Sequence, residues 1–351
     1  MWYNVFVKYI YVRNEMATQR LYPQTIICII WDFDGTLVPG YMQQPLFDEY
    51  GIDASQFWKE VNQLPNLYEK QGLVVSKDTA YLNHILTYTE HSIFKGLTNK
   101  KLKELGGKLQ FYPGLPKFLG EVKEHVNKHP EFSKHGIEVE HYIVSTGLKP
   151  MIEGSPVYQY VDGIWACEFI EDVIPPGFNP QAEMDLEGVK TISQIGYMLD
   201  NTTKTRAIFE INKGTNDDPR IDVNASIPLE HRRVPFPHMI YIADGPSDIP
   251  CFSLINHFHG KTYAVYDRKN KKNFAQVVDL NEQGRVQAFG EADYSQDSQT
   301  HMWIMHAVES IAAQIVSDRT STLKLIVHPP PNYITPTTGN GFSEETSELV
   351  S

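Results

Sequence analysis

One short apolar run constrains the fold of this chain more than any other feature. Residues 25–31, TIICIIW, are almost all apolar, and Asp32, Asp34 and Gly35 follow directly. A short run that is hydrophobic throughout, without alternation, is typical of a strand buried on both faces, and we expect a central strand of a parallel sheet. Because burying a charge is costly unless it is paired, we expect both carboxylates at an edge of the core, beside a cation or a reacting group.

Further strand patterns alternate with helical ones along the chain. Four more strands are predicted in residues 137–147, 163–172, 238–244 and 261–267. Core helices are predicted around residues 115–122, 204–212 and 298–317. This alternation indicates an α/β fold with a doubly wound, mainly parallel sheet.

One block of the chain has no strand pattern. Residues 41–110 are predicted to hold helices that begin after Asp53, Ser76 and Thr98, and therefore to form an inserted helical cap. Residues 213–236 are polar with prolines and are expected to form a long surface excursion. The predicted division is an N-terminal extension at 1–24, an α/β core at 25–40 and 111–325, the cap at 41–110 and a flexible C-terminal tail at 326–351.

Composition narrows the class of function. The formal net charge is −12, so a nucleic-acid-binding surface, which needs basic clusters, is not expected. The three cysteines lie in or beside apolar runs and no CxxC or HExxH occurs, so neither disulfides nor a zinc site is indicated. No apolar run is long enough to cross a bilayer. We expect no membrane partner and a cytoplasmic location. The N-terminal stretch is a poor secretory signal, and Met16 is an alternative start to Met1.

Chemically useful side chains follow several of the predicted strands. The residues at the strand ends, and at the start of the helix before the fourth strand, are Asp32, Asp34, Ser145, Asp244, Asp248 and Lys204. In sheets of this kind, ligands bind at the carboxyl ends of the strands. Clustered carboxylates repel one another unless a cation lies among them. Hard oxygen ligands select Mg²⁺, which commonly acts together with phosphates.

These groups are sufficient for phosphoryl transfer. A carboxylate can act as a nucleophile toward phosphorus, and Mg²⁺ and a lysine can balance the charge on the equatorial oxygens. A second acid close to the first can protonate the leaving oxygen. We therefore expect a small-molecule phosphate ester as the partner, whereas the oligomeric state is not predicted.

The order of DFDGTL, IVSTG, a helix-opening lysine and IADGPSD resembles the haloacid dehalogenase superfamily, over residues 25–270. The layout looks most like the phosphoserine-phosphatase-like branch. The resemblance implies that Asp32 is the nucleophile and that Asp34 is the general acid and base, with its main-chain carbonyl on Mg²⁺. It also implies roles for the remaining motif residues: phosphate binding by Ser145, Thr146 and Lys204, and Mg²⁺ binding by Asp32, Asp244 and, directly or through water, Asp248. One departure is Ala243, where many relatives carry glycine.

Several residue assignments have alternatives. Lys149 and Lys190 are rival phosphate-binding lysines, and Asp248 could instead cap the helix that follows it. Four residues after the first strand could line a substrate pocket, although the hinge and cap core is the favoured interpretation. They are Tyr41, Gln43, Gln44 and Phe47.

The leading functional hypothesis is a Mg²⁺-dependent phosphatase that works through an aspartyl-phosphate. A phosphomutase or phosphotransferase would use the same core. A dehalogenase needs no leaving-group acid, so the second aspartate argues against one, and an intact set of site residues argues against a non-catalytic binding protein. The physiological substrate is not predicted.

Overall fold

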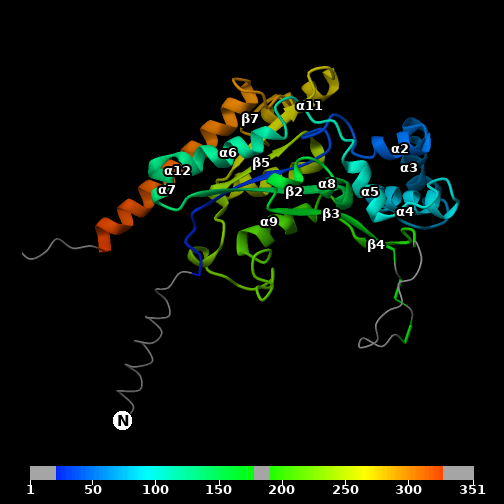
Figure 1. The fold of residues 1–351 in the computed structure, drawn as a ribbon, viewed down its shortest axis with the longest axis horizontal. Helices are drawn as coiled ribbons and strands as arrows, with labels where there is room; N and C mark the ends of the chain where they lie inside the picture. Colours follow the sequence, from blue (N-terminus) through cyan, green and yellow to red (C-terminus); the bar gives the residue numbers. More distant parts are fainter. Residues whose placement is uncertain (1–20, 172, 175, 178–189, 327–351) are drawn as a thin grey trace, which may run out of the picture.

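A single sheet organises the chain. The computed structural model describes residues 21–171, 173–174, 176–177 and 190–326 (Figure 1). Within these residues the sheet has seven strands in the order β4-β3-β2-β1-β5-β6-β7. The strands are β1 Ile26–Trp31, β2 Glu138–Leu148, β3 Gly163–Ile170, β4 Gln194–Tyr197, β5 Met239–Ala243, β6 Lys261–Tyr266 and β7 Ala288–Glu291. All neighbours pair in parallel except β3 and β4, so the predicted mainly parallel α/β sheet, with β1 at its centre, is confirmed.

Helices cover both faces of the sheet. The helices in the described part of the chain are α2 Gln44–Tyr50, α3 Ala54–Glu69, α4 Lys77–Glu90, α5 Asn99–Gly106, α6 Lys117–Lys128, α7 Pro130–Lys134, α8 Lys149–Glu153, α9 Lys204–Lys213, α10 Ile249–His257, α11 Lys271–Glu282 and α12 Gln299–Ile326. Short 3₁₀ turns are η1 Tyr158–Tyr160, η2 Leu229–His231, η3 Phe236–His238 and η4 Pro246–Asp248. In Figure 1, α6 and α12 lie on one side of the sheet and α9 on the other. None of the described helices is long and apolar enough to span a membrane.

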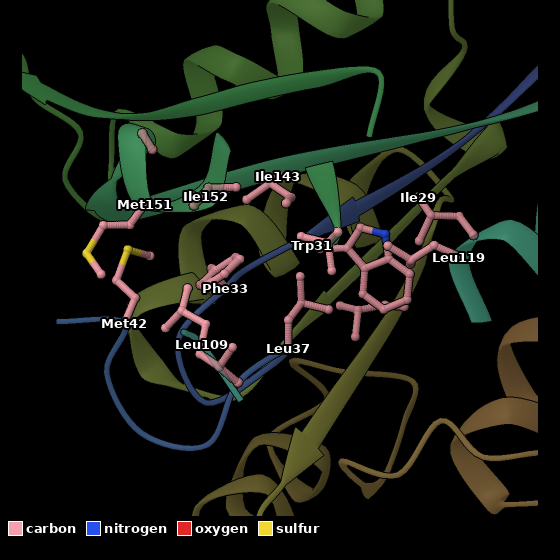
Figure 2. Close-up of a cluster of buried hydrophobic side chains, with 14 of the residues drawn as sticks. Ile29, Trp31, Phe33, Leu37, Met42, Leu109, Leu119, Ile143, Met151 and Ile152 are labelled. Carbon is pink, nitrogen blue, oxygen red and sulfur yellow. The ribbon is translucent and has the colours of Figure 1, made fainter. Parts of the chain in front are cut away.

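The central strand β1 contributes side chains to two separate cores. Ile27, Ile29 and Trp31 pack in the cluster that contains side chains of α6 and α12 (Figure 2). Cys28 and Ile30 point the other way, into the cluster formed with α9, α10 and α11. Successive side chains of a strand alternate between faces, and here both faces are buried. This explains why the run is apolar at every position.

The inserted block is helical, as expected, and comprises α2 to α5. The side chains of Asp53, Ser76 and Thr98 each accept an N–H hydrogen bond at the start of α3, α4 and α5, as their positions in the sequence predict. Near the two ends of the predicted cap, Met42 and Leu109 are buried in the same cluster as β1 (Figure 2). The chain segments that enter and leave the cap are therefore part of the core.

Two strands were not expected from the sequence, β4 and β7. The C-terminal helix is also longer than predicted and continues to Ile326. Residues 213–236 are largely irregular, as expected, although Arg233 near their end is buried and forms an ion pair of 2.6 Å with Glu140 of β2. The predicted tail after residue 326, and most of the predicted N-terminal extension, lie outside the described residues.

Candidate active site

Three carboxylates meet at the carboxyl edge of the sheet. Asp32 follows β1, Asp244 follows β5, and Asp248 ends the short turn after β5. Since β1 and β5 are neighbouring parallel strands, their ends lie together. One oxygen from each of the three carboxylates lies within 4.8 Å of the others. The structure thus brings together the acidic residues that the sequence placed at separate strand ends.

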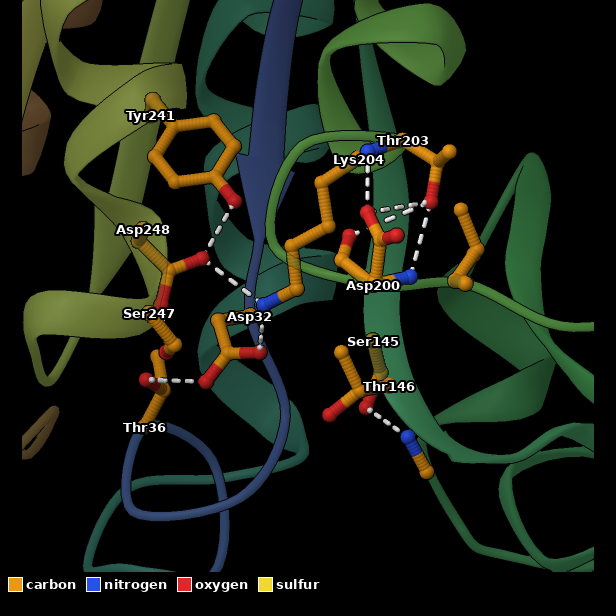
Figure 3. Close-up of polar contacts among 12 residues, drawn as sticks. Asp32, Thr36, Ser145, Thr146, Asp200, Thr203, Lys204, Tyr241, Ser247 and Asp248 are labelled. Carbon is orange, nitrogen blue, oxygen red and sulfur yellow. Dashed lines mark hydrogen bonds and ion pairs between the residues drawn. The ribbon is translucent and has the colours of Figure 1, made fainter. Parts of the chain in front are cut away.

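Lys204 joins two of these carboxylates. It is the first residue of α9, its side chain is 1% exposed, and its Nζ lies 2.7 Å from Asp32 Oδ1 and 2.8 Å from Asp248 Oδ1 (Figure 3). Burial lowers the pKa of Lys204, but the charges of Asp248 and Asp32 outweigh it and raise the pKa above its ordinary value. Lys204 therefore carries a positive charge within the site.

The start of α9 is fixed by a side chain that precedes it. Asp200 Oδ1 accepts the backbone N–H groups of Thr202 and Thr203 at 2.8 and 2.7 Å. These bonds order the turn before α9, and the N–H of Lys204, the first helical residue, donates to the Asp200 carbonyl at 3.1 Å. The ordered turn sets the direction in which Lys204 enters the site.

Asp248 serves the site and not the helix after it. Its Oδ1 accepts a hydrogen bond from the Tyr241 hydroxyl at 2.6 Å as well as from Lys204, and its Oδ2 accepts one from Ser247 Oγ at 2.7 Å (Figure 3). Although it precedes α10, its side chain makes no capping hydrogen bond. Asp248 thus occupies the N-cap position of α10, but its side chain does not cap the helix.

Asp32 and Asp34 have different protonation tendencies. Burial raises the pKa of Asp32 to about 6, with Lys204 opposing the rise. Burial and the charge of Asp32 raise the pKa of Asp34 to about 8, although its Oδ1 accepts the N–H of Met42 at 2.8 Å. The pKa of Asp34 is thus raised further than that of Asp32. Two carboxyl groups with separated pKa values suit one nucleophile and one proton donor.

The turn after Asp34 requires a glycine. Gly35 has φ +73°, a conformation in which L side chains are strained, and a Cβ there would lie 2.3 Å from Asp244 Oδ2. The G of the DFDG motif thus lets the chain pass close to the third carboxylate. Thr36, which follows, places its Oγ1 3.3 Å from Asp32 Oδ2.

A cavity of about 640 Å³ opens in front of these groups. Seven of the predicted site residues line it, namely Asp32, Asp34, Tyr41, Ser145, Thr146, Lys204 and Asp244. Ser145 is 1% exposed, and its Oγ accepts the N–H of Gly147 at 3.0 Å. The Thr146 carbonyl accepts a hydrogen bond of 2.7 Å from Tyr81 of α4, which ties the cap to this edge of the sheet.

The structure places other candidate residues elsewhere. Lys149, an alternative candidate for phosphate binding, pairs with Glu168 at 2.7 Å. Neither Lys149 nor Lys190 is among the described residues that line the cavity. Gln44 is exposed and donates to Asp48 at 2.7 Å, away from the lining residues. Phe47 is buried against Phe57, with ring centroids 4.9 Å apart, and belongs to the cap core.

Some contributors were missed at the sequence level. Tyr241 and Ser247 hold Asp248, and Gln276 of α11 donates to the Asp244 carbonyl at 3.1 Å. A polar signal existed for Tyr241, because a tyrosine within a buried strand needs a partner for its hydroxyl. No comparable signal marked Gln276, since its position depends on how α11 packs.

The donor set fits a divalent cation. Asp32, Asp244 and Asp248 bring three carboxylates together, whereas Lys204 supplies one positive charge. In the described part of the chain, the Asp244 carboxylate has no hydrogen-bond donor and no ion-pair partner, and burial with the charges of Asp32 and Asp248 raises its pKa well above its usual range. A hard cation with oxygen ligands, as Mg²⁺ is, would balance this charge. Asp32 and Asp244 would be its direct side-chain ligands, because the oxygens of Asp248 already accept three hydrogen bonds.

The topology and the placement of the motifs agree with the haloacid dehalogenase-like fold that the sequence predicts. The DFDGTL, IVSTG and IADGPSD motifs lie at the carboxyl ends of the neighbouring strands β1, β2 and β5, and the helical insertion follows β1. The class is thus an α/β protein of this fold with an acidic site at the sheet edge.

Comparison with known proteins places the chain in a family. No protein-family model matches it. An uncharacterised protein of Borreliella burgdorferi is 39% identical over 288 residues, which is 81% of this chain and 97% of that protein. The chain belongs to the same family as this protein.

Solved structures with a similar architecture are more distant. A hydrolase of the HAD family from Salmonella enterica serovar Typhi has 14% identity and a TM-score of 0.46, over 76% of this chain and 67% of that one. A probable phosphoserine phosphatase from Vibrio cholerae has 13% identity and a TM-score of 0.44, over 85% and 68%. Because both TM-scores are below 0.5, the chemistry of the site rests on this chain's own motifs and geometry.

Proposed function

We propose that this protein is a Mg²⁺-dependent phosphatase that hydrolyses a small phosphomonoester through an aspartyl-phosphate on Asp32. The observation that carries the proposal is the buried contact of Lys204 with Asp32 and Asp248, next to Asp244 and in front of a cavity. A lysine held against a nucleophilic carboxylate lies where it can also contact the oxygens of a phosphate in that cavity.

In the first half of the reaction, one oxygen of Asp32 attacks phosphorus and the bond from phosphorus to the ester oxygen breaks. Asp34 gives its proton to the leaving oxygen, for which its raised pKa suits it. Lys204 and the Ser145 hydroxyl hold the phosphoryl oxygens. When bound, the divalent cation would supply further charge stabilisation for these oxygens.

In the second half, Asp34 acts as the base. It takes a proton from a water molecule, which attacks phosphorus from the side that the alcohol has left. The bond between phosphorus and Asp32 then breaks, and inorganic phosphate and the free carboxylate result. A phosphomutase or phosphotransferase would replace this water with an acceptor hydroxyl.

Phosphate release from p-nitrophenyl phosphate tests the proposal. We expect activity with added Mg²⁺, loss on chelation and recovery when Mg²⁺ is restored. Asp32→Asn should abolish turnover and keep the fold by circular dichroism, because an amide is not a competent nucleophile. Asp53→Asn in the cap is the matched control and should stay active. Full activity in metal-free protein, or in Asp32→Asn, would contradict the proposal.

A further inference from the structure

A second cavity of about 260 Å³ adjoins the first on its cap side. The two share four residues, Asp34, Tyr41, Asp78 and Thr146. A substituent on the alcohol of a phosphate ester would extend from the ester oxygen past Asp34 and into this space. The cap residues that line it are Tyr41, Gln43, Trp58, Val61, Asn62, Lys77, Asp78 and Tyr81.

Gln43 lines this second cavity, and its side chain has an unused acceptor. Its side chain is 2% exposed, and its Oε1 is buried without a hydrogen-bond partner among the described residues. The backbone of Gln43 is fixed, since its carbonyl accepts the N–H groups of Leu46 and Phe47 at 2.9 and 3.1 Å. An unpaired buried acceptor costs roughly 1–3 kcal/mol. A ligand that donates a hydrogen bond here would recover that cost.

The charges around the second cavity favour a cation. Asp78 lines both cavities, and apart from its own backbone N–H its side chain has no hydrogen-bond or ion-pair partner in the part of the chain that the structure describes. Neither cavity has an arginine among its described lining residues, and Lys204 is already shared by two aspartates. Lys77 is the remaining basic residue of the second cavity, and it is exposed. A carboxylate or a second phosphate on the substrate would face Asp78 with little compensation.

The aromatic and aliphatic side chains that line the second cavity are also compatible with a cationic ligand. The rings of Trp58 and Tyr41 lie with their centroids 4.9 Å apart, beside Val61. Aromatic faces attract ammonium groups and pack against short methylene chains.

We propose that the second cavity binds the ammonium end of the leaving group, so that the substrates are phosphate esters of small primary amino alcohols. Gln43 Oε1 accepts an N–H of the ammonium group and Asp78 supplies the opposite charge. This inference rests on the proposed phosphatase function, because it assigns the alcohol that leaves when Asp32 attacks.

Matched esters test the inference. With Mg²⁺ present, kcat/KM for 2-aminoethyl phosphate should exceed that for its neutral isostere propyl phosphate by about tenfold or more, the size expected for one charged hydrogen bond. It should also exceed the values for 2-hydroxyethyl phosphate and for O-phosphoserine, which adds a carboxylate. Gln43→Met and Asp78→Asn should each reduce the ratio of aminoethyl to propyl ester, whereas the exposed control Gln44→Met should keep it. Equal values for the aminoethyl and propyl esters, or a preference for O-phosphoserine, would overturn the inference.

A binding measurement separates this inference from the proposed function. Calorimetric titration of Asp32→Asn with the same esters reports on the cavity without turnover. Equal affinity for aminoethyl and propyl phosphate would overturn the inference, even where wild type hydrolyses p-nitrophenyl phosphate. The wild-type protein could instead bind the aminoethyl ester more tightly and yet hydrolyse no ester. That result would support the assignment of the second cavity and overturn only the proposed phosphatase function.

Discussion

Lys204 is the residue on which the buried charge of the site depends. Its ammonium group lies between the carboxylates of Asp32 and Asp248, and all three side chains are nearly inaccessible to solvent. Removing one partner of a buried ion pair leaves an uncompensated charge, which costs about 3–5 kcal/mol, whereas an exposed pair contributes about 0–1 kcal/mol. The same lysine is therefore expected to affect stability as well as the proposed binding of phosphate.

We expect Lys204→Met to lower the free energy of unfolding by about 3–5 kcal/mol at pH 7 without divalent metal. The control is Lys149→Met, which removes the partly exposed pair with Glu168 and should cost less than about 1 kcal/mol. Urea unfolding followed by circular dichroism measures both values. Similar small losses in the two variants would mean that Lys204 is not the counter-charge of the buried carboxylates.

Asp34 should matter most for poor leaving groups. An alkoxide needs a proton as it leaves, and p-nitrophenolate needs it much less. Because general acid catalysis is worth about 10²–10⁴-fold, Asp34→Asn should lose more rate on an alkyl phosphate than on p-nitrophenyl phosphate by a factor in that range. The variant should also accumulate the phosphorylated enzyme, detectable by mass spectrometry, because no base activates water. Equal losses on the two substrates, with no adduct, would assign Asp34 to the fold or the metal.

At the scale of helices and strands, the contact between α5 and α8 joins the cap to the core. A Cβ on Gly106 of α5 would lie 2.0 Å from the Met151 carbonyl oxygen, and one on Gly154, which ends α8, would lie 1.7 Å from the Lys103 carbonyl oxygen. The two backbones therefore approach as closely as glycine permits. Since α8 directly follows β2 and its Ser145 and Thr146, this contact links the cap to the predicted phosphate-binding residues.

Gly106→Ala should therefore disturb the junction. The added methyl group has no space, and overpacking of this kind costs typically about 1–3 kcal/mol. Gly107→Ala is a matched control on the next residue, where the nearest atom, the Glu104 carbonyl oxygen, lies at 3.3 Å. Urea unfolding of the two variants gives the comparison. A Gly106→Ala variant as stable as Gly107→Ala would show that the α5–α8 contact can relax.

The sequence predicts the buried elements better than the exposed ones, for a physical reason. β1 is buried on both faces, so its apolar run is continuous and its end is marked by Asp32. The edge strands β4, QIGY, and β7, AFGE, have four residues each and are largely not buried, and each contains a glycine. Such strands carry little hydrophobic pattern, because their formation depends on the neighbour with which they pair.

Prediction of the site from the sequence is limited in the same way as prediction of the strands. Asp32, Asp34 and Asp244 could be predicted because strand ends of a parallel sheet converge. The unpaired oxygen of Gln43 could not, because a missing hydrogen bond depends on every side chain around it. The partners of Asp248 likewise depend on the turn that brings Ser247 and Tyr241 to it.

For the molecule as a whole, the buried histidines set part of the pH dependence of stability. His141 of β2 is fully buried, with Nδ1 3.1 Å from Trp31 Nε1 and Nε2 2.9 Å from the Leu119 carbonyl oxygen. The indole N–H only donates, so Nδ1 must accept, and the ring proton is on Nε2, donated to Leu119. A second proton would have to sit on Nδ1, facing the N–H of Trp31. Burial, aided by Lys123, accordingly lowers the pKa of His141 to about 3, and burial lowers that of His238 to about 4.

These lowered histidine pKa values determine whether the stability of the fold rises or falls with pH. In the unfolded chain a histidine has a pKa of about 6.5, so between this value and the folded pKa the unfolded state binds a proton that the native state does not. Stability therefore falls as pH decreases through this window, by up to about 1.4 kcal/mol per pH unit for each histidine. The raised pKa values of Asp32 and Asp34 act in the opposite direction, because the native state keeps protons that the unfolded chain has lost. A comparison of variants is needed to isolate His141.

His141→Asn provides that comparison, because its amide oxygen can still accept from Trp31 while the side chain no longer titrates. We expect the variant to be less stable than wild type at pH 7.5, since it loses packing and the bond to Leu119. Between pH 7.5 and pH 5.0 the contribution of His141 to wild-type stability should fall by about 2 kcal/mol, so the gap between wild type and variant should narrow by that amount. Urea unfolding at several pH values, with Mg²⁺ held constant, measures the gap. A gap that stays constant would mean that His141 takes up its proton in the folded protein as readily as in the unfolded chain, and that its two hydrogen bonds do not fix the neutral ring.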